Sequence, residues 1–273
     1  MRPKKNNVYA SYLCVLANIF FVILMLNSPS LLYAITGLEI IVNEDERDRG
    51  KDVTSTSVFR LINKRGQQRI RNTVYYWKDW YGRDGFDEKT IIFFNSPPEV
   101  EGTGFLNWSY MDIDKDDDQW LYLPALRKIK RISGSDKEDS FMGTDFTFDD
   151  MGDRQVEEDV HKLVREEKYQ DRQCYIVESI PKEKKYIYSK KMVWVDKQEW
   201  IVHKVEFYDR KARHMKTLLI KWIKTQGIWA RKLMHMSNVQ TGHQTFIEID
   251  NIKINTGLGE DYFTKRTLRQ KGH

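Results

Sequence analysis

Histidines, carboxylates and two cysteines, Cys14 and Cys174, are the residues that could do acid–base, nucleophilic or metal chemistry in this chain. Cys174 lies in an apolar, strand-like stretch, where an inert buried thiol is far more common than a nucleophile. The sequence holds no HExxH, GxSxG, P-loop or dinucleotide fingerprint. The histidines that could act as bases or ligands are scattered: His161, His203, His214, His235 and His243. We therefore predict a protein that is not an enzyme and that holds no metal and no cofactor.

An acidic run, Asp112–Asp118, places Asp112, Asp114 and Asp116 at alternate positions, as calcium loops do. An EF-hand loop needs glycine at its sixth position and glutamate at its twelfth, and here those positions are Asp117 and Leu123. Because both requirements fail, the run is interpreted as a solvated turn between strands.

A basic run follows the apolar strand that begins at Trp120. If this run is extended, Arg127 and Arg131 share one face and could hold an anionic group between two guanidinium forks. A lipid phosphate or the carboxylates of a partner protein would suit such a pair. The alternative is an edge strand that its lysines keep soluble.

The next stretch, SFMGTDFTF at 140–148, has neither helical nor strand periodicity but carries Phe141, Met142, Phe146 and Phe148. One hypothesis is a lid whose apolar side chains fill a cavity until a ligand displaces them. The other is an ordinary part of the core, because Met and Phe suit both environments. The predicted ligand-binding residues are Trp77, Tyr122, Phe141, Met142, Phe146, Phe148 and Trp194.

The first 34 residues predict a cleaved secretory signal peptide. Arg2, Lys4 and Lys5 precede an apolar run from Tyr12 to Leu26, and the small residue Ala34 suits cleavage. The run is shorter than the roughly 20 residues that span a bilayer comfortably. Removing these three positive charges lowers the formal balance from +5 to +2, which argues against a nucleic-acid partner. We expect one domain, residues 35–273, in the periplasm.

The rest of the chain predicts a mainly β fold. After a short amphipathic helix that starts near Ile35 and whose charged tail ends at Gly50, apolar stretches and short turns alternate at roughly 10-residue intervals, as in an antiparallel meander. About eleven strands in one sheet must twist and curl, which predicts an incomplete barrel with short helices and loops as a lid. Several strands are apolar on both faces, such as Met192–Val195, so both faces need cover.

Four stretches carry a resemblance to a known family. LYLPALRKIKRISGSDKEDSFMGTDFTFDDM, the GTGFLNW and DKDDDQW before it, and VQTGHQTFIEIDNIKINTGLGEDYFT near the end resemble the bacterial outer membrane lipoprotein-sorting proteins. The likeness covers nearly all of residues 35–263. It implies a LolA-like fold, an incomplete antiparallel barrel around a hydrophobic cavity.

The resemblance also implies a function. We expect a periplasmic carrier or chaperone that binds a lipid or the acyl chains of a lipoprotein, in outer-membrane lipid or lipoprotein transport. An inner-membrane exporter of hydrophobic molecules is a further expected partner. The alternative is an accessory or regulatory module that docks on such an exporter or on an envelope sensor and carries nothing.

Overall fold

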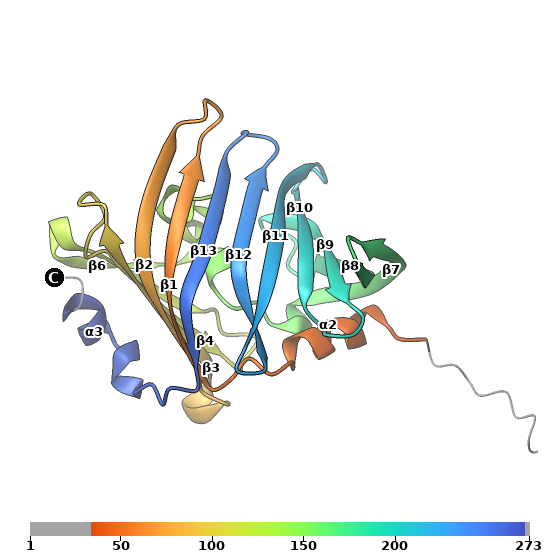
Figure 1. The fold of residues 1–273 in the computed structure, drawn as a ribbon, viewed down its shortest axis with the longest axis horizontal. Helices are drawn as coiled ribbons and strands as arrows, with labels where there is room; N and C mark the ends of the chain where they lie inside the picture. The colour runs from red at the N-terminus through yellow and green to blue at the C-terminus, as the bar shows by residue number, and fades with distance from the viewer. Residues whose placement is uncertain (1–33, 271–273) are drawn as a thin grey trace, which may run out of the picture. The chain divides into compact units, whose positions relative to one another are not determined.

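Thirteen antiparallel strands form one continuous sheet in the computed structural model, which describes residues 34–270. The chain divides into two units, Met1–Ile35 and Thr36–His273, and the fold belongs to the second. The predicted signal peptide lies, up to residue 33, outside the described residues. The sheet curls without closing, and its edges are β6 and β7 (Figure 1). The predicted incomplete antiparallel barrel is thus confirmed, with more strands than the eleven or so expected.

The strands pair in the order β6-β5-β4-β3-β2-β1-β13-β12-β11-β10-β9-β8-β7, so the first and last strands meet in the middle of the sheet. The basic run forms the edge strand β6, which is one reason that the count rises. The strand bounds are β1 Asp52–Ile62, β2 Gln68–Asp79, β3 Phe86–Ser96, β4 Gly104–Tyr110, β5 Asp118–Leu123, β6 Lys128–Ile132, β7 Asp159–Tyr169, β8 Arg172–Pro181, β9 Tyr188–Asp196, β10 Val202–Asp209, β11 His214–Thr225, β12 Ile228–Asn238 and β13 Gln244–Ile254.

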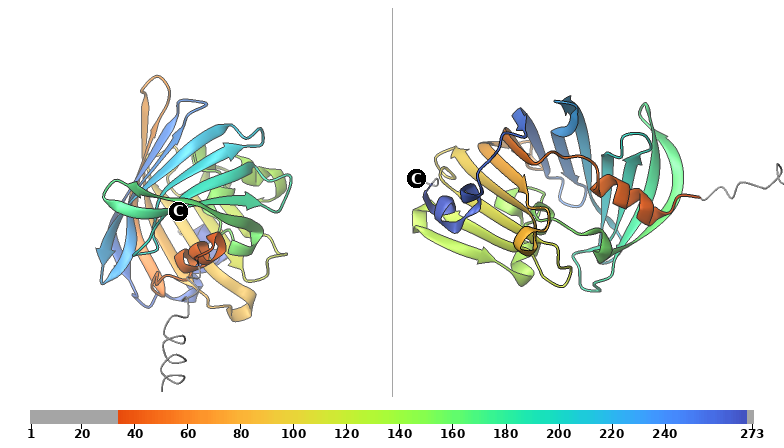
Figure 2. Two further views of the ribbon diagram at one scale, coloured as in Figure 1. Left: turned by 90° about the vertical axis from the view of Figure 1, so that its right-hand side faces the viewer. Right: turned by 90° about the horizontal axis from the view of Figure 1, so that it is seen from below.

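This strand order dictates the path of residues 133–158, which we call the crossover segment. Because β6 and β7 are consecutive in the chain but form opposite edges of the sheet, the segment between them must cross the whole sheet. It does so on the concave side, where Figures 1 and 2 show it in green. The segment is built from short 3-10 turns, among them Phe141–Gly143 and Asp149–Met151.

Helix α2, Gly37–Asp45, begins with a capping box in which Thr36 and Glu39 bond each other's backbone amides. It packs against β7 and β8, and the chain then crosses one end of the curled sheet to reach β1 (Figure 2). A helix after Ile35 was predicted and is present, and it ends at Asp45, inside the charged run that leads to Gly50. Gly50 instead has φ of 80° in the connection to β1.

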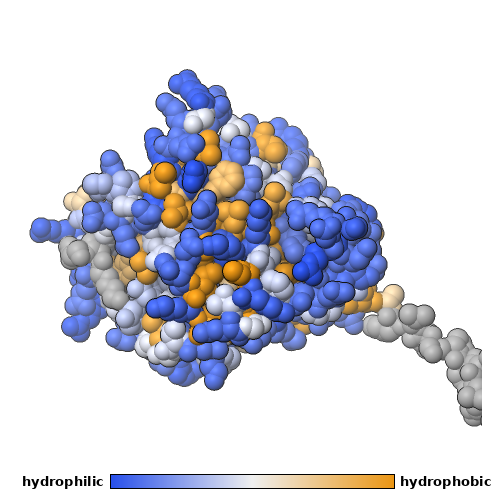
Figure 3. Space-filling model, viewed as in Figure 1, coloured by the Kyte–Doolittle hydropathy of each residue, from blue (hydrophilic) through white to orange (hydrophobic). Residues whose placement is uncertain are grey.

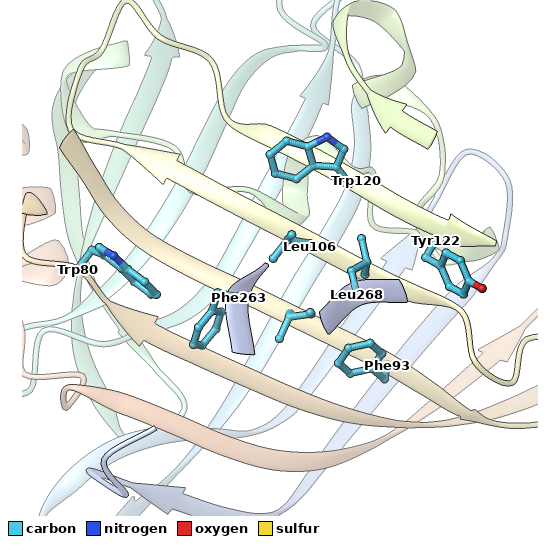
Figure 4. Packing of buried hydrophobic residues seen from close by; sticks show 8 residues of the cluster. Trp80, Phe93, Leu106, Trp120, Tyr122, Phe263 and Leu268 are labelled. Atoms are coloured by element: carbon cyan, nitrogen blue, oxygen red, sulfur yellow. The ribbon is translucent and has the colours of Figure 1, made fainter. Parts of the chain in front are cut away.

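The outer face of β2–β5 is covered by the C-terminal segment, a 3-10 turn at Glu260–Phe263 followed by helix α3, Lys265–Gln270. Phe263 and Leu268 pack on Trp80, Phe93 and Leu106 (Figure 4). Trp80 meets the ring of Phe263 edge-on at 5.3 Å. Strands β3 and β4, which are apolar on both faces, are covered on both faces here, whereas Met192–Val195 of β9 lies outside this cluster.

The outer face of the central strands is a mosaic of polar and apolar side chains. Figure 3 shows apolar residues gathered near its middle among charged ones. Ile70 of β2 and Ile223 of β11 remain 48% and 43% exposed. His235 and Phe246 stack across β12 and β13 with ring centres 4.0 Å apart, which covers part of the apolar surface.

Candidate functional site

A cavity of about 350 Å³ lies between the concave face of the sheet and the crossover segment. Its walls alternate along each strand, as the pleat requires: Leu218 and Ile220 of β11 face inward together with Trp222. From the crossover segment, Phe146 and residues 150–153 close one side. The other wall residues are apolar or hydroxylated for the most part and come from β1, β2, β3, β12 and β13, among them Ser57, Phe59, Tyr75, Trp77, Ile92, Met234 and Ile247.

Next to the cavity, the crossover segment fills the concave face with a cluster of aromatic rings. Phe141 contacts Phe105 of β4 and Phe148 edge-on, with ring centres 5.1 and 5.5 Å away. Phe94 of β3 completes the group at 6.0 Å from Phe141. All four side chains are buried, so this part of the crossover segment is a packed plug.

A buried ion pair ties the plug to the opposite wall. Nζ of Lys216, whose side chain is 1% exposed, lies 2.6 Å from Oδ2 of Asp150 and donates to the Asp145 carbonyl at 2.9 Å. The hydroxyl of Tyr188 donates to both oxygens of Asp150. Burial opposes the ionisation of Asp150, yet Lys216, the Thr147 amide and Tyr188 together lower its pKa.

Asp145 forms a second anchor, on β13. Its Oδ2 accepts from the Thr245 hydroxyl and lies 2.7 Å from Nδ1 of His243. Elsewhere, Nε2 of Gln119 on β5 donates to the Phe148 carbonyl at 2.9 Å, and Arg71 of β2 donates to the Met142 carbonyl. The TDFTFDD stretch therefore supplies rings to the concave face and carboxylates to the strands that hold it.

One end of the cavity is charged. Glu88 of β3 and Arg49, in the connection from α2, face each other at 3.4 Å on the cavity wall beside Asp153. Burial raises the pKa of Glu88 to about 7, while Arg49 opposes the shift and Asp87 adds to it. Burial likewise raises the pKa of Asp153, with Glu88 and Asp87 as like-charged neighbours.

Two of the predicted ligand-binding residues, Trp77 and Phe146, line the cavity. Phe141 and Phe148 lie in the plug beside it, and Met142 occupies the turn between them with φ of 51°. Tyr122 lies on the outer face in the cluster under α3 (Figure 4). Trp194, on β9, packs with Cys174, Ile176 and Met192.

The predicted arginine pair falls on β6 and the turn before it. Arg127, with φ of 49°, precedes the strand, whereas Arg131 lies within it. Nη2 and Nε of Arg131 both donate to Oδ1 of Asp118 on β5, at 2.5 and 3.1 Å. The guanidinium of Arg131 thus has a carboxylate partner inside the chain.

The sequence did not predict much of the cavity wall, including Tyr75 and Met234. It also did not predict the buried ion pair of Lys216 with Asp150. Period-two alternation groups Leu218, Ile220 and Trp222 on one face, but alternation does not show which face is concave. An Asp-Asp pair after a Phe-rich stretch was the available signal for the buried ion pair, because β11 carries three lysines and the sequence does not distinguish Lys216 from the other two.

Residues 34–270 contain no group of three or more His, Cys, Asp or Glu side chains arranged to hold a metal ion. In the same part of the chain, no helix is long and apolar enough to cross a membrane.

The open sheet, the crossover segment and the mainly apolar cavity between them define a LolA-like half-barrel. A family model described as "Uncharacterized protein" matches residues 86–270. The chain is similar to a domain named as an outer membrane lipoprotein-sorting protein from Vibrio parahaemolyticus, with 34% identity and a TM-score of 0.80 over 86% of this chain and 98% of that one. It is also similar to a DUF1329 family protein from Desulfovibrio piger, with 35% identity and a TM-score of 0.81 over 85% and 97% of the two chains.

The LolA superfamily protein NE2245 from Nitrosomonas europaea shares the fold at 18% identity, with a TM-score of 0.66 over 86% of this chain and 100% of that one. No curated protein matches the chain. The chain belongs to the family of outer membrane lipoprotein-sorting proteins, and it has the fold of a LolA superfamily protein. The resemblance carried by its central stretch is thereby confirmed.

Proposed function

We propose that this protein is a periplasmic carrier that shields an acyl chain, of a lipid or of a lipoprotein, in the cavity beneath its crossover segment. The observation that supports this most directly is the cavity itself, about 350 Å³ with Leu218, Ile220, Met234 and Ile247 in its wall. Pockets for small ligands usually measure about 300 to 1,000 Å³ and are mainly apolar. The similarity to a lipoprotein-sorting domain points to the same class of cargo.

Affinity for an acyl chain is easily reached in such a site. Burial gains about 0.8 kcal/mol per methylene group, so a chain of about fourteen carbons offers about 11 kcal/mol before ordering costs. Release is the harder step. The plug lies directly beside the cavity and contributes Phe146 to it, so a shift of the crossover segment would open or close the site.

A carrier needs no catalytic group, and two carboxylates of the cavity wall have structural partners instead. Asp150 binds Lys216, and Glu88 faces Arg49. The predicted signal peptide of residues 1–34 would deliver the protein to the periplasm, where an exporter of hydrophobic molecules is the proposed partner.

The alternative, a docking module that carries nothing, draws support from the aromatic plug, which fills part of the concave face with Phe141 and Phe148. It predicts that charge reversal at Arg127 and Arg131 abolishes capture of an inner-membrane partner without changing lipid binding. The proposed carrier also predicts that these charge reversals leave lipid binding unchanged. Unlike the docking module, it predicts that a substitution that fills the cavity abolishes lipid binding.

The cavity is tested with a matched pair of variants on β12. Met234 lines the cavity, while its neighbour Leu233 points to the outer face. Met234→Trp should weaken binding of a fluorescent fatty acid at least tenfold, and Leu233→Trp should leave it unchanged, with circular dichroism confirming both folds. Lipid extracted from the purified protein should be acyl-chain material. If the wild type binds no fatty acid and carries no lipid, the carrier function is refuted.

A further inference from the structure

We propose that Arg47, Arg231 and Trp222 form a head-group site at one end of the cavity, which binds the anionic group of a single-chain amphiphile such as a fatty acid. This inference rests on the proposed carrier function and names its class of ligand. The acyl tail would run from Trp222 along the apolar wall of the cavity, and the carboxylate would lie between the two guanidinium groups.

The two arginines come from distant parts of the chain and meet at one indole ring. Arg47 follows α2 and Arg231 lies on β12, yet their guanidinium carbons are 4.7 and 5.9 Å from the ring centre of Trp222. All three residues line the cavity. Nε1 of Trp222 donates to the Val202 carbonyl at 2.8 Å, which fixes the ring. Two like charges at one fixed ring form a ready site for an anion.

Arg47 has unused hydrogen-bonding capacity. Its side chain is only 11% exposed, and within residues 34–270 its buried Nε has no hydrogen-bond partner. Nη1 reaches the Trp229 carbonyl only at 3.4 Å. A buried donor without a partner costs about 1 to 3 kcal/mol, so an incoming oxygen that accepts from it is favoured.

Two of the three arginines at this end of the cavity already have a carboxylate neighbour. Arg49 already faces Glu88, and Glu44 lies 3.5 Å from Nε of Arg47. In the described part of the chain, Arg231 has no carboxylate within ion-pair distance. Burial, with Arg231 nearby, lowers the pKa of Arg47 to about 10 despite Glu44, and burial raises the pKa of Glu44 itself.

The shape and size of the cavity determine where the acyl tail lies and how many tails fit. From Trp222, every second residue along β11 faces inward, and Ile220 and Leu218 form an apolar track toward the plug. A volume of about 350 Å³ lies at the low end for ligand pockets, which suits one chain better than several. A head group held at Trp222 therefore places its tail against Ile220 and Leu218.

The test compares dodecanoic acid with 1-dodecanol, which share the tail and differ in the charge of the head, by displacement of a fluorescent probe. The wild type should bind the acid at least tenfold more tightly, and 0.5 M NaCl should reduce this preference. In Arg47→Gln/Arg231→Gln the preference should vanish while the affinity for the alcohol stays. Arg231→Gln alone, at an exposed residue, should reduce the preference severalfold even if the double variant folds poorly.

The control is Arg60→Gln, because Arg60 lies on β1 and pairs with Glu248 at 3.8 Å on the outer face. Its preference should equal that of the wild type. Equal binding of acid and alcohol by the wild type, or a preference that survives in the double variant, would overturn the head-group site and leave the carrier function standing. Binding of neither ligand would instead refute the carrier function.

Discussion

Lys216 and Asp150 join β11 to the crossover segment through an ion pair with an Nζ–Oδ2 distance of 2.6 Å, sealed from solvent at 1% and 9% side-chain exposure. The same ammonium group reaches the Asp145 carbonyl, so one lysine holds both ends of the stretch that contains Phe146. The pair therefore controls the position of a residue that closes the cavity.

Lys216→Met should destabilise the fold by roughly 3 to 5 kcal/mol, because it leaves the Asp150 carboxylate buried without its cation. Lys221→Met, at an exposed position of the same strand, is the control and should change the free energy of unfolding by less than about 0.5 kcal/mol. Urea denaturation followed by tryptophan fluorescence measures both. Equal stabilities of the two variants would contradict a structural role for the pair.

Phe141 in the plug and Phe146 in the cavity wall should respond differently to substitution by alanine. Phe141→Ala should cost about 3 to 5 kcal/mol, because Phe141 is fully buried among Phe94, Phe105 and Phe148. Phe146→Ala removes a wall of the cavity, so it should also shift the preferred fatty acid to a longer chain. A series of saturated acids from about ten to eighteen carbons measures the shift. An unchanged length optimum in Phe146→Ala would show that this side chain does not limit the cavity.

The strand pattern of the sequence predicted the curled sheet because alternation, turns and aromatic content are local properties. It also pointed to residues 140–148, where the periodicity stops. The reason for that break is topological: β6 and β7 are opposite edges, and residues 133–158 must cross the concave face. The lysines of the basic run indicated one edge, β6, but no local signal identified β7 as the other.

The site was harder to predict for a related reason. Trp77 lines the cavity and Tyr122 packs under α3, although both are aromatic residues in apolar strands. A shift of one residue exchanges the faces, and the choice between them depends on the twist of the sheet and on the C-terminal cover. The Arg47–Trp222–Arg231 cluster joins segments far apart in the sequence, so spacing could not reveal it.

Cys174 should be unreactive in the folded protein. Burial raises its pKa to about 11, and Asp196 and Glu167 add to the shift. Since the thiolate is the reacting species, a thiol reagent such as DTNB should modify Cys174 at least a hundredfold more slowly in the native state than in 6 M urea at pH 8. Comparable rates in both states would indicate that β8 opens readily.

Glu88 should make the stability of the fold depend on pH near neutrality. Burial raises its pKa from 4.5 to about 7, so between these values the unfolded chain has lost a proton that the folded chain retains. The contribution of Glu88 is therefore most favourable below pH 4.5 and is lost as the pH rises to 7, by roughly 1 to 3 kcal/mol. Glu88→Gln has no such proton to lose. As the pH rises from 4.5 to 7, the free energy of unfolding of Glu88→Gln should increase relative to that of the wild type. Urea denaturation at several pH values measures this difference.

The control is Glu248→Gln, on the outer face. It should follow the wild type at every pH, because Glu248 is half exposed beside Arg60. Parallel profiles for Glu88→Gln and the wild type would mean that Glu88 ionises as freely in the folded state as in the unfolded chain.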